Sequence, residues 1–465
     1  MENKIEKILN KNIYLIATFG YSLLIWCMRF LVSDTQLLFQ IVLFMLIPIG
    51  LVWFLQLLIL KNSLYTIPLL FSIFFSIGVG GTDLSLETLN HLVIGSITVI
   101  LLFSGIIVFL VKNKVKIKLN TLGFALLLVV VSFFIPFVYN DFSIDAFLIS
   151  SIAILFLSFY LFYSNTLKIS STEYIYRILL ILGIMLSLQL FILVNYYIYN
   201  YPGSINDGIR MLLNNGFPVD SPGWGNVNDL TIILLLCSSP LIYYIVVKKY
   251  NIFPWLLLTW YSILTFLVLS RGSMITFTLL CIGLVIYIFL KKNLKAIKVF
   301  LVILIIGCIV IIANINLLIE LINGINLSAG SDLSFMLTGR IRLWENAIYL
   351  FSRYPIFGSG WYTPLFVLYP DQNRITIYHS TFFHVLATGG VFGLLVLCYF
   401  FYKAITLFKR VKPFNIVWPF IIVYILTQAH GLIDNTQYML IYTLITLVVM
   451  SFFEKNNSNL LIATI

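Results

Sequence analysis

The sequence predicts an all-α polytopic membrane protein of about 12–14 transmembrane helices, with a large, partly helical extracytoplasmic loop. Of the 465 residues, 61% are hydrophobic and only 10% are charged, and the mean hydropathy is +1.05. Ordinary globular domains hold about 25% charged residues. Apolar runs recur along the whole chain, each close to the roughly 20 residues that cross a bilayer core. These observations predict a single multi-pass membrane domain over residues 1–465.

Fourteen apolar windows are candidate spans. Their ranges are 13–32, 37–60, 63–80, 92–111, 121–138, 146–163, 178–198, 230–247, 253–270, 273–290, 297–314, 381–402, 415–432 and 437–453. The first window follows a short basic segment and lacks a small-residue cleavage site, so it is interpreted as a span and not as a cleaved signal peptide. The five cysteines all lie in apolar runs, which predicts neither a disulfide framework nor a metal motif.

Lysine and arginine divide unequally between the two sides that these windows define. If the N-terminus is cytoplasmic, every lysine falls on the inner side, together with Arg177 and Arg410. The outer side receives the other arginines, which are Arg29, Arg210, Arg271, Arg340, Arg342, Arg353 and Arg374. Because positive residues concentrate in cytoplasmic loops, this pattern supports the window count and places both termini in the cytoplasm. The basic residues lie in short loops, so the net charge of +11 does not indicate nucleic-acid binding.

Two outer segments are too long to be simple connections. The shorter extracytoplasmic loop, 200–229, is rich in Gly, Pro and Asn, and the large one, 315–380, is rich in aromatic residues. An apolar stripe within the large loop predicts an amphipathic helix over 337–353, on the outer leaflet or packed over the bundle. The stripe consists of Ile341, Trp344, Ile348 and Phe351. We expect the large loop to carry part of an active site.

Arg271 is a candidate anion-binding residue in the turn Ser270-Arg271-Gly272, at the predicted outer boundary of the membrane. It is either an interfacial anchor or a bidentate donor to phosphate. The absence of outer lysine favours phosphate binding, because a guanidinium presents a planar donor fork that an ammonium lacks.

Arg340 is the second candidate for anion binding. It follows Thr338, a candidate N-cap, so the free amides of a first helical turn would add to an anion site there. Arg342 projects from another side of the predicted helix, where Glu345 would be its solvated partner.

His379 is a candidate general base, because it lies where the large loop enters the span at 381–402. A lone histidine is often structural, but a neutral imidazole at this place could accept a proton from a sugar hydroxyl. His384 is expected to pack inside the bundle, and His430 could form a supporting pair with Asp434. The small residues Ala387, Gly389, Gly390 and Gly393 are interpreted as allowing close helix–helix contact.

The outer side offers no P-loop, no dinucleotide fingerprint, no Asp-x-Asp and no His/Asp cluster at metal-ligand spacing. The sequence therefore predicts neither a metal nor a cofactor.

Several of these residues together resemble a known family. His379-Ser380, nine residues, Gly390, two residues and Gly393 resemble the motif of the O-antigen ligases. Ser270-Arg271-Gly272 is similar to that family's Ser-Arg-Gly element. Residues 339–344 and 355–360 resemble its Arg…Trp…Pro-x-x-Gly-x-Gly stretch. The resemblance covers about 225–440 and extends to the wider O-antigen ligase-related family, which includes Wzy-type polysaccharide polymerases.

The resemblance implies a metal-independent glycosyltransferase of surface polysaccharide biosynthesis (lipopolysaccharide or capsule) in a bacterial cytoplasmic (inner) membrane. The donor would be an undecaprenyl-diphosphate-linked glycan, the acceptor a hydroxyl of a glycan, lipid or protein, and the active site extracytoplasmic. Arg271 and Arg340 would hold the diphosphate and stabilise the charge on the leaving group, while His379 would orient or deprotonate the acceptor hydroxyl. The other expected substrate-binding residues are Trp344, Gly358, Gly360 and Trp361.

Other functions remain open from the sequence. Within the family, a ligase and a polymerase are not distinguished. From another class, a lipid-linked oligosaccharide flippase or transporter is the alternative, although transporters tend to show internal repeats and intramembrane charges. A sensor or scaffold would not need the combination of Arg271, Arg340 and His379.

Overall fold

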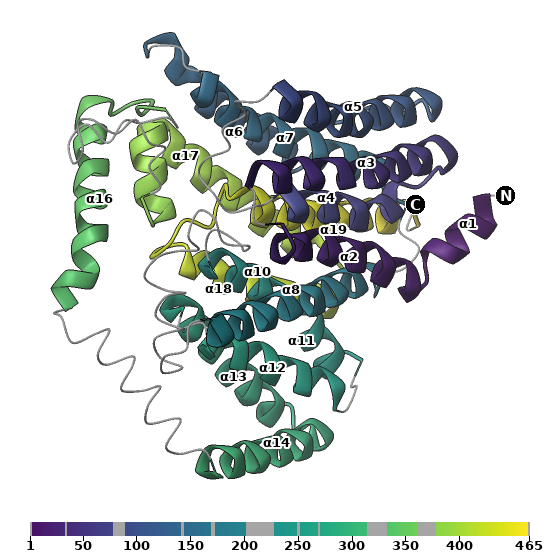
Figure 1. Cartoon of the computed structure of the whole chain (residues 1–465), viewed down its shortest axis with the longest axis vertical. Coiled ribbons are helices and arrows are strands. Elements are labelled where there is room, and N and C mark those ends of the chain that lie inside the picture. The colour runs from purple at the N-terminus through teal and green to yellow at the C-terminus, as the bar shows by residue number, and fades with distance from the viewer. Residues whose placement is uncertain are drawn as a thin grey trace. The chain divides into compact units, whose positions relative to one another are not determined.

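The computed structural model is helical, with no strand among the residues it describes, which confirms the predicted all-α fold (Figure 1). It describes residues 2–32, 35–77, 89–140, 144–168, 173–200, 227–248, 252–267, 270–313, 333–360 and 378–463. Within these ranges, six helical segments are long and apolar enough to cross a membrane. They are Leu37–Ile59, Ala146–Thr166, Glu173–Tyr196, Asn228–Val246, Gly272–Leu290 and Thr381–Arg410. The predicted class of polytopic membrane protein is thereby confirmed.

The chain forms two compact units, each described here by itself. The first comprises residues 1–117 and 165–303. Its helices are α1 (Glu2–Leu9), α2 (Asn12–Cys27), α3 (Thr35–Ile59), α4 (Ile67–Ile77), α5 (Leu89–Lys112), α8 (Glu173–Asn200), α10 (Val227–Leu236), α11 (Ser239–Val246), α12 (Phe253–Leu267), α13 (Arg271–Leu290) and the start of α14 (Leu294–Ala313). In this unit α3 packs along α5 and α4, while α8 packs against α2, α10 and α11.

The second unit comprises residues 118–164 and 304–465. Its helices are α6 (Gly123–Phe134), the 3-10 turn η3 (Ile135–Val138), α7 (Ile144–Thr166), α16 (Leu333–Arg353), α17 (Thr381–Arg410), α18 (Trp418–His430) and α19 (Leu440–Ala463). α17 is the central element, because it contacts α6, α16 and α19.

Within the described residues every predicted apolar window is mostly helical, although not every window is one continuous helix. The window 230–247 contains α10 and α11, which meet at Cys237 and Ser238. Pro240 stands at the start of α11, where its missing amide hydrogen and fixed φ suit a first helical turn and oppose a continuous helix. Of the predicted shorter outer loop, residues 201–226 lie outside the described ranges.

The large loop is partly helical, as predicted, but its helix begins earlier than expected. α16 starts at Leu333, so Thr338 lies inside the helix and is not its N-cap. Arg340 is consequently beyond the first turn, where the amides are bonded within the helix, and the predicted help from free amides is wrong.

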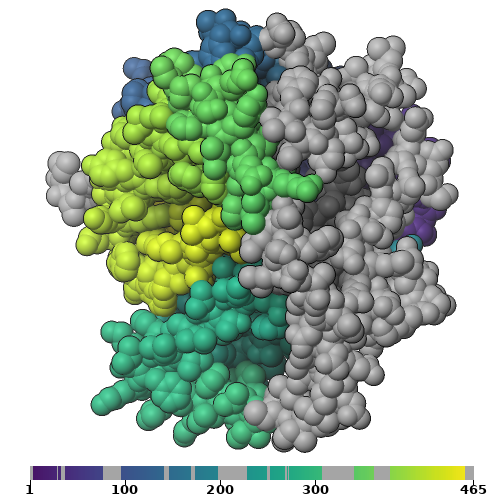
Figure 2. All heavy atoms as spheres, turned by 90° about the vertical axis from the view of Figure 1, so that its left-hand side faces the viewer, coloured from purple at the N-terminus to yellow at the C-terminus, as the bar shows by residue number. Residues whose placement is uncertain are grey.

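The face that α16 buries also differs from the predicted stripe. Ile341 and Ile348 are 40% and 53% exposed. The buried positions of α16 are Asn346, Ala347 and Leu350. Asn346 and Ala347 are smaller than the isoleucines of the predicted stripe, so α16 can pack closely against α17. α16 lies on the molecular surface beside α17 (Figure 2).

α17 is interrupted at Gly390, whose φ of 60° and ψ of −155° are not helical. In an unbroken helix the amides of Val391 and Phe392 would bond to the carbonyls of Ala387 and Thr388. They bond instead to the carbonyls of Pro355 and Ile356, at 2.9 Å each. The predicted use of Gly390 in helix–helix contact is therefore wrong, because this glycine breaks its helix against the turn that follows α16.

This turn and the residues after it, segment 355–360, also satisfy the carbonyls that the break leaves free. The amide of Ser359 donates to Ala387 at 2.8 Å, and the amide of Gly360 donates to Thr388 at 3.0 Å. On its other side, the Tyr139 hydroxyl donates to the carbonyl of Gly358, and Asn140 Nδ2 donates to that of Ser359 at 2.6 Å. The segment is thus fixed between the break in α17 and the residues that follow α6.

Candidate functional site

His379 lies directly before α17, whose N-cap is Ser380. Its φ is +44°, in the left-handed region that a residue with a β-carbon seldom adopts. Such backbone strain is concentrated at functional sites and persists only where the surroundings enforce it.

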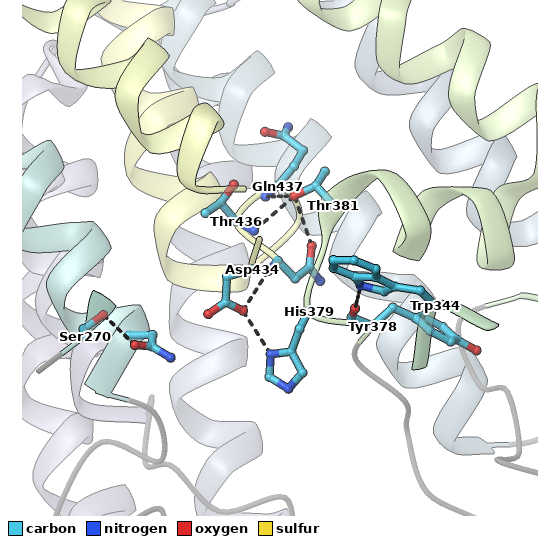
Figure 3. Close-up of polar contacts among 10 residues, drawn as sticks. Ser270, Trp344, Tyr378, His379, Thr381, Asp434, Thr436 and Gln437 are labelled. Atoms are coloured by element: carbon cyan, nitrogen blue, oxygen red, sulfur yellow. Dashed lines mark hydrogen bonds and ion pairs between the residues drawn. The ribbon is translucent and has the colours of Figure 1, made fainter. Parts of the chain in front are cut away.

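The side chain of His379 is paired with a buried carboxylate. Its Nδ1 lies 3.2 Å from Oδ1 of Asp434, which follows α18 (Figure 3). The Asp434 side chain is 4% exposed, whereas that of His379 is 37% exposed. The pair therefore has an inner carboxylate and an outer imidazole that remains accessible.

The pKa of Asp434 is lowered from its ordinary value. Burial alone would raise it, but the hydrogen bond and charge of His379, the backbone amide of Asn435 and the charge of His430 together outweigh burial. Asp434 is therefore ionised at neutral pH and can only accept hydrogen bonds. Because of this, Nδ1 of His379 must be the donor, and in the neutral ring Nε2 is the free acceptor that a general base needs.

The loop that carries Asp434 is attached to the start of α17 through Thr381. The Thr381 amide donates to the carbonyl of Gly431 at 2.8 Å. Its hydroxyl accepts from the amides of Thr436 and Gln437, at 3.2 and 3.4 Å. The same hydroxyl lies 3.5 Å from Asn435 Oδ1, to which it donates.

α16 holds the residue before His379. Trp344 Nε1 donates to the carbonyl of Tyr378 at 3.0 Å (Figure 3). The Trp344 ring stacks on the ring of Phe383, with 4.9 Å between the ring centroids. Asn346 Nδ2 donates to the hydroxyl of Tyr378 at 3.2 Å. Tyr378 also belongs to a small core with Ala347, Leu350 and Ala387. Trp344, expected to bind substrate, therefore has a structural contact next to His379.

Arg340 belongs to the same neighbourhood. The guanidinium of Arg340 disfavours a protonated imidazole at His430, whereas the carboxylate of Asp434 favours it. His430 is buried at the end of α18, and its predicted partner Asp434 directs its carboxylate to His379. The structure thus brings His379 and Asp434 together, and Arg340 acts on the neighbouring His430. Arg342 and Glu345 are both exposed, and they form none of the ion pairs found among the described residues.

Other predicted site residues have different positions. Gly358 and Gly360 are buried in the segment that closes the break in α17, with positive φ of 75° and 85°. Their predicted substrate contacts stay a prediction, as does that of Trp361, which lies outside the described residues. His384 is fully buried, as expected.

Arg271 belongs to the first unit, where it is the first residue of α13. The preceding Ser270 hydroxyl donates to Asn228 Oδ1 at 2.6 Å, and its Oγ lies 3.0 Å from Ser273 Oγ. Ser273 in turn bonds to Thr231 of α10 at 2.6 Å. Buried hydroxyls and an amide thus fix the start of α13 against α10, directly beside Arg271. Its role in anion binding stays a prediction.

The family assignment follows from these motifs in their folded setting. Residues 256–398 match the Wzy_C family model, described as O-antigen ligase. This region is thus similar to the O-antigen ligase family. A search of curated proteins found no match to the chain. The ligase-family region includes Arg271, Arg340 and His379 and supports a role in glycan processing at a membrane, whereas a flippase gains no support from it.

Asp434 lies beyond the ligase-family region, and its pairing with His379 was not recognised from the sequence. The two residues are 55 positions apart, and no spacing rule connects the end of one helix with the loop after another. The available signal was an acidic residue at the same predicted end of the bundle as His379. Across the described parts of the chain, no group of three or more His, Cys, Asp or Glu residues could hold a metal ion.

Proposed function

We propose that the protein is a metal-independent membrane glycosyltransferase that transfers or polymerises an undecaprenyl-diphosphate-linked glycan at the extracytoplasmic face. The observation that carries the proposal is the bond between His379 Nδ1 and the ionised Asp434, within a chain that contains a ligase-family region. This bond leaves Nε2 of an accessible histidine free to accept a proton.

In the proposed reaction, the oxygen of an acceptor hydroxyl attacks the anomeric carbon of the donor glycan. The new C–O bond forms as the bond from that carbon to the diphosphate oxygen breaks, with inversion at the carbon. The hydroxyl proton passes to Nε2 of His379, and Asp434 stabilises the resulting imidazolium. The diphosphate leaves with the bonding electron pair.

An arginine guanidinium can bind the diphosphate leaving group in this scheme. Arg340 interacts electrostatically with His430 at the end of α18, and its guanidinium can form paired hydrogen bonds to phosphate oxygens. We assign Arg271 the same kind of role on the strength of its Ser-Arg-Gly element. Charge that develops on the diphosphate is stabilised most by donors already in place.

The direct test is purified protein in liposomes that contain undecaprenyl-diphosphate-linked glycan. Addition of a hydroxyl acceptor should produce elongated or attached glycan and free undecaprenyl diphosphate in equal amounts. A product that grows in repeat units without any other acceptor indicates a polymerase, and single attachment to a lipid or protein indicates a ligase. Absence of both products under conditions where the protein is folded contradicts the proposal.

Replacement of Arg340 by lysine is expected to lower transfer about 10- to 100-fold, the equivalent of one charge-assisted hydrogen bond of about 1.5–3 kcal/mol. Lysine keeps the charge but loses the donor fork. Arg342→Lys is the matched control, because Arg342 is an exposed residue of the same helix. Full transfer by Arg340→Lys would exclude bidentate phosphate binding, and Arg271→Lys tests the other arginine in the same assay.

The proposed orientation has its own test in a variant without native cysteines. A cysteine at Ser352, which is exposed on α16, should react in whole cells with a thiol reagent that cannot cross the membrane. A cysteine at Lys409, exposed at the other end of α17, should react only after the membrane is permeabilised. The reverse pattern would contradict the extracytoplasmic site.

A further inference from the structure

The strained backbone of His379 is held from both sides along the chain. A left-handed conformation costs about 1–3 kcal/mol at a residue with a side chain, so neighbouring contacts must compensate for it. Those contacts are formed by Tyr378, one residue before, and by Thr381, two residues after (Figure 3). Neither residue has a place in the proposed chemistry.

The contact before His379 fixes a peptide group. The carbonyl of Tyr378 belongs to the peptide bond that joins Tyr378 to His379, and Trp344 Nε1 donates to it at 3.0 Å. The Trp344 ring is fixed in turn by stacking on Phe383 with an interplanar angle of 16°. Rotation about φ of His379 is therefore restricted, because the peptide plane on its N-terminal side cannot turn without breaking this bond.

The contact after His379 connects it to its partner. The Thr381 hydroxyl donates one hydrogen bond and accepts two, from Thr436 and Gln437. A hydroxyl has one donor and two acceptor positions, so its capacity is fully used. Because the bonded amides follow Asp434 by two and three residues, this hydroxyl sets the distance between the carboxylate and His379.

We infer that Thr381 and Trp344 are positioning residues, which hold His379 and Asp434 in hydrogen-bonding register without contacting substrate. The inference rests on the proposed function of His379. It predicts that loss of either contact weakens the His379–Asp434 bond while the donor-binding residues are left in place.

The test compares Thr381→Val, which removes the hydroxyl at nearly constant shape, with Thr381→Ser, which retains it. Thr381→Val is expected to lower kcat about 5- to 50-fold with little change in the KM for the donor, since one or two hydrogen bonds of about 1 kcal/mol are lost. Thr381→Ser should restore most of the rate. Thr406→Val is the matched control, because Thr406 is an exposed threonine of the same helix, bonded only to its own helix at Tyr402.

A spectroscopic readout separates positioning from a general structural effect. The ¹⁵N spectrum of histidine-labelled protein reports which ring nitrogen carries the proton, and the His379 signal is identified by its loss in His379→Ala. The wild type should show His379 protonated at Nδ1, and Thr381→Val should show a mixture of the two tautomers. Unchanged tautomer and unchanged kcat would overturn the inference, as would a lower kcat with the tautomer unchanged.

Trp344→Phe provides a second variant if Thr381→Val does not fold. Phenylalanine keeps an aromatic ring for Phe383 but cannot donate to Tyr378, so the same loss of kcat and the same mixture of tautomers are expected. A wild-type spectrum and rate in this variant would overturn the role of Trp344. The tautomer measurement needs no substrate, so it tests positioning even if His379→Ala remains fully active and the proposed function fails.

Discussion

Replacement of His379 by alanine is expected to lower glycan transfer about 100- to 10,000-fold, the usual contribution of a general base. The loss should fall on kcat, because the imidazole accepts a proton in the transition state and contributes little to donor binding. The measurement is the rate of undecaprenyl diphosphate release in liposomes, at equal amounts of folded protein. Arg342→Gln serves as a control, since it changes an exposed residue near the site.

Asp434→Asn should have an effect of comparable size through the tautomer of His379. An asparagine can offer its NH₂ group to Nδ1, which favours the ring form with the proton on Nε2. That form has no free nitrogen toward the acceptor, so it cannot act as a base. Because the two residues act as one unit, the double variant should be little slower than His379→Ala alone. Retention of full transfer by His379→Ala would contradict the catalytic role of the pair.

Replacement of Gly358 by alanine is expected to destabilise the second unit by roughly 2–5 kcal/mol, from the positive φ and from steric overlap. A β-carbon at this position would lie 2.3 Å from the backbone of Thr388 and Gly389. Gly390→Ala should be similarly harmful, because its β-carbon would lie 2.7 Å from the backbone of Gly358 and Ile356. Backbone cannot move aside as a flexible side chain can. Thermal unfolding in detergent measures both variants.

Gly389→Ala is the control for this pair of glycines. Gly389 adjoins Gly390, yet a β-carbon there would meet only Val385 Cγ1, at 4.0 Å. In a helical position alanine is favoured over glycine by about 1 kcal/mol, so this variant should be as stable as the wild type or more stable. If Gly358→Ala unfolds at the same temperature as Gly389→Ala, the close approach of segment 355–360 to α17 is not required for stability.

Much of the fold was predictable from the sequence, because hydropathy and charge are properties of segments. The described part of each apolar window proved to be mostly helical, since a chain in lipid must bond its amides internally. The ends of helices were less predictable, because tertiary contacts decide where a helix begins. Thr338 has the chemistry of an N-cap, but α16 starts at Leu333. Its packed face uses Asn346 and Ala347, which no apolar stripe would indicate.

The site was predictable only in part, for a different reason. His379 and Arg340 could be identified as residue types at one end of the bundle, and the ligase-family region includes both. The pairing of His379 with Asp434 depends on how a loop after α18 is attached to the start of α17. Hydrogen bonds between segments so far apart leave no periodic trace in a sequence. The role of Pro355–Gly360 in closing a broken helix is equally invisible, although its glycines were noticed.

The break at Gly390 has a mechanical consequence. A continuous transmembrane helix that tilts to match bilayer thickness carries both of its ends with it. In α17 the amides of Val391 and Phe392 bond instead to segment 355–360, whose own amides bond to Ala387 and Thr388 on the other side of the break. Both parts of α17 are therefore bonded to the same segment. A tilt of the longer part is passed through that segment to the start of α17, which follows His379.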